Sequence, residues 1–190
     1  AIQLDKAGLT ANQVSLLGFS LGLLALPLLA LQNYLAALLL IALNRIADGL
    51  DGELARRHGA TRAGAFLDIS CDFIFYSAIV LGFILAQPET NSVAGATLML
   101  SFMATGATFL AFATLAQQLQ LSSIDYPSKG FYYLGGITEG TETIIFFVLC
   151  CLWPTYFPIL AFGFAGLCFI TAAIRLYSGF ATLKSVEQAG

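Results

Sequence analysis

The sequence predicts an all-α, polytopic membrane protein with six transmembrane helices. Its 190 residues are 58% hydrophobic and only 10% charged, whereas a soluble domain of this size carries about 25% charged residues. The apolar residues also fall into six separate runs, each close to the roughly 20 residues that a helix needs to cross a bilayer. The eight lysines and arginines form no basic stripe, so nucleic-acid binding is not expected.

Aspartates distinguish the second and third spans from the first. The first is expected at 14–31, with an interruption at Pro27. The second, at 34–57, and the third, at 63–86, both carry aspartates near the short polar loop that joins them. These two spans therefore present their acidic residues at the same side of the membrane.

The last three spans are more uniformly apolar. They are expected at 93–119, 136–153 and 156–183. Gly163 and Gly166 in the sixth span, like Gly18 and Gly22 in the first, are expected to allow close approach of neighbouring helices, because small residues serve that purpose in membranes.

The basic residues predict the orientation. The loops at 32–33, 87–92 and 153–158 contain no lysine or arginine, so the positive-inside bias places both termini and the aspartates in the cytoplasm. The opposite, cytoplasmic side would hold Lys6, Arg56, Arg57, Arg62, Lys129 and Lys184. The chain is expected to form one domain over residues 1–190, with its natural N-terminus, and an N-terminal surface helix, missing.

Four aspartates form the most informative pattern in the chain. Asp48 and Asp51 lie three residues apart, and Asp68 and Asp72 lie four apart, so each pair shares one helix face with about 5–6 Å between Cβ atoms. A charged side chain within a membrane costs about 2.5–3.5 kcal/mol, and four carboxylates repel one another. Hard divalent cations such as Mg²⁺ would offset this cost and often share their site with substrate phosphates. Helix capping at the water interface would not need two such pairs.

The residues around these aspartates resemble the signature of the CDP-alcohol phosphotransferases, also called class-I CDP-alcohol phosphatidyltransferases. The pattern is Asp48-x2-Asp51-Gly52-x2-Ala55-Arg56-x7-Gly64-x3-Asp68-x3-Asp72. The hydrophobic layout and the opening Gly-Leu-Thr-Ala-Asn at 8–12 extend the resemblance over most of the chain, and a bacterial inner-membrane branch is the most similar. The resemblance implies a multi-pass, homodimeric transferase of substituted phosphate groups (EC 2.7.8 type) that uses two Mg²⁺ or Mn²⁺ ions in phospholipid biosynthesis.

The resemblance also assigns roles to individual residues. Asp48, Asp51 and Asp68 would hold the metals, and Asp72 would be both a ligand and the general base that takes the proton of the attacking alcohol. Two ions about 3.5–4 Å apart can clamp the attacking and leaving oxygens of an in-line displacement. The nucleotide would lie against Asn12, Gly52, Ala55, Arg56 and Gly64. Capping of a helix by Asn12 and membrane anchoring by Arg56 remain alternatives.

Polar residues later in the chain are candidates for contact with the acceptor alcohol. They are Lys129, Glu139, Glu142 and Arg175. Interface snorkelling or stabilisation of a helix N-terminus explains them equally well. A phosphorylated acceptor would favour a denser basic cluster than Lys129 and Arg175 provide.

The expected reaction is transfer of a phosphatidyl group from CDP-diacylglycerol, a membrane lipid, to a small polar alcohol, with release of CMP. One alternative reverses the partners, with a soluble CDP-alcohol as donor and diacylglycerol as acceptor. A second is an Asp-rich intramembrane prenyltransferase, whose first motif needs a further aspartate where this chain has Ala55. A third is a divalent-cation transporter, which would need acidic residues in the opposite half of the membrane as well.

Overall fold

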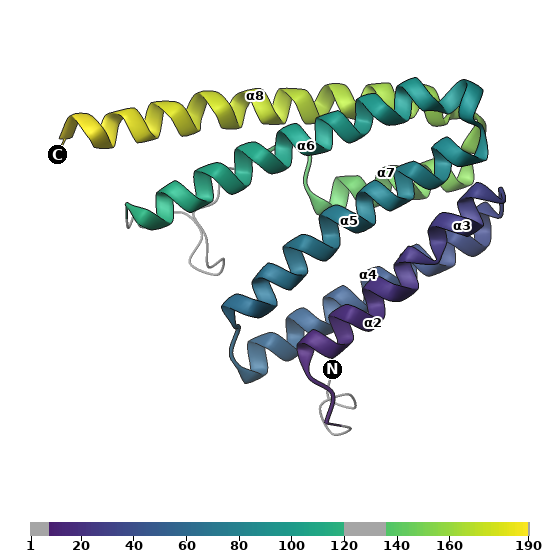
Figure 1. Cartoon of the computed structure of the whole chain (residues 1–190), viewed down its shortest axis with the longest axis horizontal. Coiled ribbons are helices and arrows are strands. Elements are labelled where there is room, and N and C mark those ends of the chain that lie inside the picture. The colour runs from purple at the N-terminus through teal and green to yellow at the C-terminus, as the bar shows by residue number, and fades with distance from the viewer. Residues whose placement is uncertain (1–7, 120–135, 190) are drawn as a thin grey trace.

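The computed structural model describes residues 8–119 and 136–189 and confirms the all-α fold class. Each of the six apolar runs forms helix in the described residues, and Figure 1 shows these helices side by side in one bundle. The elements are α2 (Ala11–Leu23), α3 (Ala25–Ala30), α4 (Tyr34–His58), α5 (Arg62–Ala86), α6 (Pro88–Gln118), α7 (Gly140–Leu152), the 3₁₀ helix η1 (Pro154–Tyr156) and α8 (Phe157–Ala189).

The polytopic character is also clear from the helices. Within the described residues, four helical segments are long and apolar enough to cross a membrane: Ala11–Ala30, Arg62–Ala86, Pro88–Gln118 and Pro154–Gln188. The 25-residue α4 is long enough but carries charged residues along its second half, and α7 has only 13 residues. At 1.5 Å per residue α7 is about 20 Å long, which is less than the thickness of a bilayer core. Membrane crossing by α4 and α7 therefore remains a prediction.

Pro27 divides the first span as expected. A proline lacks the N–H that would bond to the carbonyl four residues earlier, which here belongs to Leu23. The helix α2 ends at Leu23 and α3 starts at Ala25. The two short helices still lie end to end and together reach from the N-terminal side to the loop before α4 (Figure 1).

The turn between α4 and α5 sets the register of the aspartates. Gly59 ends α4 with φ +92°, a left-handed conformation that glycine adopts without strain, and the Thr61 hydroxyl caps α5 by accepting from the Gly64 N–H at 3.0 Å. Asp48 lies ten residues before the end of α4, and Asp72 lies ten residues after the start of α5. Both carboxylates therefore sit about 15 Å from the turn, at the same depth.

Helix packing follows small residues in one part of the bundle and not in another. A Cβ added at Gly18 would lie only 2.5 Å from the Ala47 Cβ, so the missing side chain lets α2 approach α4. Among the described residues, a Cβ at Gly163 or Gly166 would meet no atom of another helix within 4 Å. The predicted close packing at these two glycines is therefore wrong within this chain.

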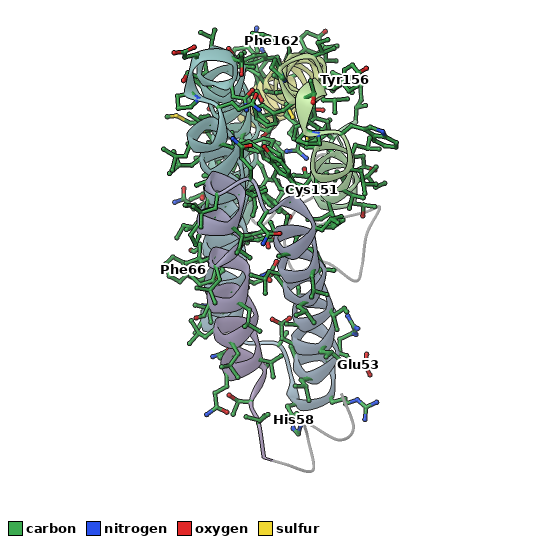
Figure 2. The ribbon with its side chains drawn as sticks, turned by 90° about the vertical axis from the view of Figure 1, so that its right-hand side faces the viewer. Glu53, His58, Phe66, Cys151, Tyr156 and Phe162 are labelled. Carbon is green, nitrogen blue, oxygen red and sulfur yellow. The ribbon has the colours of Figure 1, made fainter. Side chains whose placement is uncertain are left out.

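Aromatic rings fill the core at the η1 end of the bundle. Phe83 stacks on Phe157 with ring centroids 4.7 Å apart, and Phe146 stacks on Phe164 at the same distance. In Figure 2, the labelled Tyr156 and Phe162 lie at this end, whereas Glu53 and His58 lie at the opposite end, near the α4–α5 turn. The polar residues of α4 and α5 are thus separated from the apolar core along the length of the bundle.

Candidate active site

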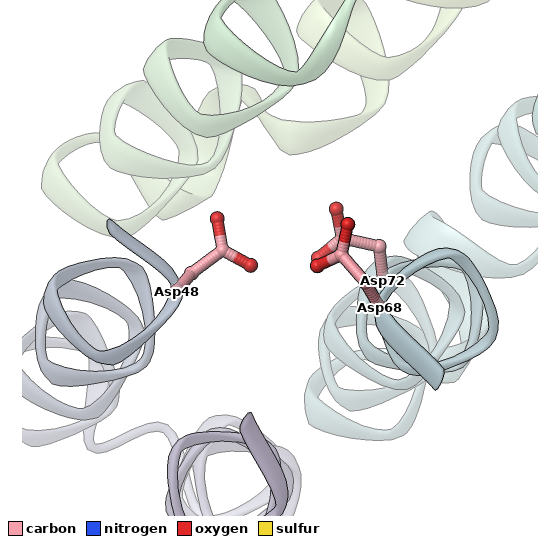
Figure 3. Close-up of side chains that lie close together, drawn as sticks. All are labelled: Asp48, Asp68 and Asp72. Atoms are coloured by element: carbon pink, nitrogen blue, oxygen red, sulfur yellow. The ribbon is translucent and has the colours of Figure 1, made fainter. Parts of the chain in front are cut away.

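Three of the four aspartates meet in the space between α4 and α5. Asp48 reaches across from α4 toward Asp68 and Asp72 on α5, as Figure 3 shows. One carboxylate oxygen from each of the three lies within 4.8 Å of the others. Asp51 is buried and lies beside this group without joining it at that distance. Since carboxylate oxygens are the donors that hard divalent ions prefer, the donor set fits Mg²⁺ or Mn²⁺.

Arg45 is a member of this cluster that the sequence reasoning missed. Its Nη2 lies 2.8 Å from Asp72 Oδ1, and its Nη1 lies 3.5 Å from Asp48 Oδ2. Arg45 comes three residues before Asp48, a spacing that places the two on one helix face and could have indicated the contact. The Tyr76 hydroxyl, one turn after Asp72, donates to Asp72 Oδ2 at 3.3 Å. Both carboxylate oxygens of Asp72 are thus engaged.

The first of two large cavities lies beside the cluster, between the starts of α2 and α5 and the end of α4. It has a volume of about 840 Å³ and includes Asp48, Asp51 and Asp68 in its wall, and we call it the nucleotide-side cavity after the nucleotide residues that the sequence predicts there. Four of the five residues predicted to contact the nucleotide also line it: Asn12, Gly52, Ala55 and Gly64. Three of these four have side chains no larger than a methyl group, so most of the space is left open.

Asn12 and Arg56 take positions that the sequence left undecided. Asn12 is not the cap of α2, because Thr10 fills that role in a capping box with Gln13. The Asn12 Oδ1 instead lies 3.2 Å from where a Cβ of Gly64 would be. Arg56 is exposed, with Nη2 2.9 Å from a carboxylate oxygen of Glu53, and is not part of the cavity wall.

A second cavity of about 320 Å³ opens on the other side of Asp68. It lies between α5, α6, α8 and the start of α7, with Asp68 and Asp72 in its wall, and we call it the acceptor-side cavity after the acceptor residues that the sequence predicts there. Glu139 and Arg175, two of the four residues predicted on the acceptor side, also line it. Threonine hydroxyls add neutral polar groups, from Thr105, Thr138 and Thr143.

The other two predicted acceptor residues are placed differently. Glu142 forms a capping box with Glu139 at the start of α7, where its Oε2 accepts from the Glu139 N–H at 2.9 Å. This is the helix-terminus role that the sequence left open as an alternative. Lys129 lies outside the described residues.

The sequence is similar to a described protein family and to individual proteins of known sequence. The sequence profile described as CDP-alcohol phosphatidyltransferase matches residues 8–175. The chain is 55% identical to the Escherichia coli inner membrane protein YnjF over 97% of this chain and 90% of that protein. It is 36% identical to archaetidylinositol phosphate synthase of Pyrococcus horikoshii over about half of each chain (53% and 54%).

Solved structures of phosphatidylinositol phosphate synthase from Mycobacterium tuberculosis have the same fold. The structure with CDP-DAG bound has a TM-score of 0.70 at 24% identity, covering 94% of this chain and 90% of that one. The complex with manganese and citrate has a TM-score of 0.73 at 25% identity, covering 94% and 86%. The shared fold thus extends over nearly the whole chain.

Proposed function

This chain belongs to the CDP-alcohol phosphatidyltransferase family of transferases, and we propose that it transfers a phosphatidyl group from CDP-diacylglycerol to a small polar alcohol, releasing CMP. The observation that carries this proposal is the position of Asp68. It belongs to the carboxylate cluster and also lines both cavities, so a donor in one and an acceptor in the other would meet at the cluster. The reversed arrangement, with a soluble CDP-alcohol and diacylglycerol, would use the same site.

The carboxylate cluster would hold the divalent ions. We assign Asp48, Asp68 and Asp72 as ligands because their oxygens already converge, and Asp51 as a further ligand because it is buried beside them. Mg²⁺ or Mn²⁺, in two copies, would stabilise the negative charge on the phosphate oxygens. The manganese complex of the mycobacterial synthase supports this assignment.

The nucleotide-side cavity suits the CDP part of the donor. Gly52, Ala55 and Gly64 leave room for a flat base or a ribose against the helices, and Asn12 supplies an amide beside Gly64. Arg56 lies just outside, where turning its exposed guanidinium away from Glu53 would bring it toward the phosphates. The mycobacterial synthase with CDP-DAG bound supports a CDP-linked lipid as donor.

We assign Asp72 as the general base. It faces the acceptor-side cavity, where a carboxylate can accept the proton of an alcohol within hydrogen-bond reach. The alcohol oxygen then forms a bond to the phosphorus that carries the diacylglycerol. The bond between that phosphorus and the bridging oxygen breaks, and its electron pair leaves with CMP.

The lining of the acceptor-side cavity supports a neutral polar alcohol as the acceptor. Asp68, Asp72 and Glu139 are acidic and Arg175 is basic, while three threonines offer hydroxyl groups. A neutral polyol fits this mixture, because it needs many hydrogen-bond partners and no cluster of positive charge. A phosphorylated alcohol, as the names of the archaeal and mycobacterial relatives suggest for those proteins, would depend on Arg175 and on the bound cations.

The Escherichia coli relative, an inner membrane protein, supports a proposal for the cellular location. We propose a bacterial inner membrane location, six spans, and cytoplasmic termini and active site, since the cytoplasm supplies CDP-linked substrates. We further propose one domain and a homodimer, which chemical crosslinking in membranes would test. Family membership favours phosphatidyl transfer over the prenyltransferase and transporter alternatives.

The decisive experiment is CMP release by the purified protein. It would be supplied with Mg²⁺ and CDP-diacylglycerol, and with glycerol, glycerol phosphate, serine, inositol phosphate or choline in separate reactions. Acceptor-dependent CMP is the expected result, and an Asp68→Ala protein is the matched blank. CMP formed only from a soluble CDP-alcohol plus diacylglycerol would reverse donor and acceptor. No CMP in either arrangement would contradict the proposal.

A further inference from the structure

Arg45 places a permanent positive charge inside the carboxylate cluster. Its side chain is only 18% exposed, and its guanidinium spans the space between Asp48 on α4 and Asp72 on α5. Its Nη2 donates a hydrogen bond to Asp72 Oδ1 at 2.8 Å, and Asp72 is one of the three residues whose carboxylate oxygens lie close together. A guanidinium is charged at every physiological pH, so this positive charge is present whether or not a metal is bound.

The guanidinium is also held from its other side. Its Nε and Nη2 donate to Asn44 Oδ1 at 2.8 and 2.6 Å, and Asn44 Nδ2 donates in turn to the Gly18 carbonyl at 3.0 Å. The charge lies over the ring of Phe75, 5.0 Å from its centroid, and 5.8 Å from that of Tyr76. Groups from α2, α4 and α5 therefore fix Arg45 independently of the carboxylates.

We propose that Arg45 is a positioning residue that acts as a built-in cation of this site. Without metal, it offsets the repulsion between Asp48 and Asp72 and keeps the cluster assembled. With metal, its charge repels the incoming cation and its hydrogen bond competes for an Asp72 oxygen, so it weakens metal binding. The inference rests on the metal site of the proposed function.

The test measures Mn²⁺ binding directly, by the loss of the free-ion electron paramagnetic resonance signal with purified, chelator-stripped protein in detergent. Removing the charge in Arg45→Gln should tighten the Kd for Mn²⁺ at least about tenfold. Arg45→Lys keeps the charge, so its Kd should stay within about threefold of the natural protein. Arg62→Gln removes a charge from an exposed position at the start of α5 and should change the Kd less than about twofold.

Thermal unfolding provides a second readout. In EDTA, Arg45→Gln should melt at a lower temperature than the natural protein, and saturating Mn²⁺ should remove most of that difference, because the metal replaces the lost charge. An unchanged or weaker Kd in Arg45→Gln, or Arg45→Lys binding as tightly as an uncharged variant, would overturn the proposal. Should Arg45→Gln not fold, Arg45→Met, which is also uncharged and can pack against Phe75, takes its place in both measurements. Failure of the natural protein to bind Mn²⁺ would instead overturn the metal site, and this inference with it.

Discussion

Aromatic rings fill the bundle near η1, whereas two cavities and a cluster of charges occupy it toward the α4–α5 turn. Phe83 and Phe157 are completely buried and stack on each other, as expected for a closely packed interior. Asp48 and Asp72 instead face open space and share one arginine. The difference indicates that the packed half supplies most of the apolar burial, whereas the half with the carboxylates leaves open space beside them. Mutations in the two halves should therefore have separable effects on stability and on turnover.

The largest expected effect is on turnover, from Asp72→Asn. An amide cannot accept the alcohol proton, so CMP release should fall by about 10²–10⁴-fold, the range of a lost general base. The melting temperature should fall only modestly, because the amide is the same size but its single oxygen can accept from Tyr76 or from Arg45 and not from both. Steady-state CMP release measures the loss of turnover, and thermal unfolding measures the melting temperature. Activity within tenfold of normal would contradict the role of Asp72 as base.

The next largest effect is on stability, from Phe83→Ala. Loss of this completely buried ring and of its stacking on Phe157 and Tyr34 should lower the free energy of unfolding by about 3 kcal/mol. The rate of CMP release per folded molecule should remain within about threefold, because Phe83 lines neither cavity. The exposed Phe180 gives a matched Phe→Ala control without the packing loss. A catalytic defect in folded Phe83→Ala would show that the two halves are not separable.

Arg175→Gln should produce a smaller effect that distinguishes the two cavities. Arg175 lines the acceptor-side cavity, so the KM for the alcohol should rise about tenfold while the KM for CDP-diacylglycerol stays within about twofold. Initial rates with each substrate varied in turn would measure the two constants. An equal rise in both KM values would contradict the assignment of this cavity to the acceptor.

The smallest effect is expected from Glu142→Gln. Glutamine also serves at the third position of a capping box. The melting temperature of Glu142→Gln should therefore match that of the natural protein, and its rate of CMP release should stay within about twofold. Glu142→Ala removes one of the two hydrogen bonds of this capping box and should cost about 0.5–1 kcal/mol of stability, with little change in KM for the acceptor. A large KM increase in Glu142→Gln would restore Glu142 as an acceptor contact.

The sequence by itself determined the all-α membrane fold, the interruption at Pro27 and the identity of the aspartates. These features depend on local properties: apolar run length, the missing N–H of proline, and residue spacing on a helix. The register of Asp48 with Asp72 was also within reach, because a short turn links their two helices.

Only the tertiary structure decided which polar groups share a space. It brought Arg45 into the cluster, joined Glu139 and Arg175 in one cavity, placed Glu142 in a helix cap and left Gly163 and Gly166 unpacked. These outcomes depend on the direction in which each helix face points after α4, α5, α6 and α8 have packed. Helix periodicity fixes which residues share a face, but the packing of distant segments decides what that face meets.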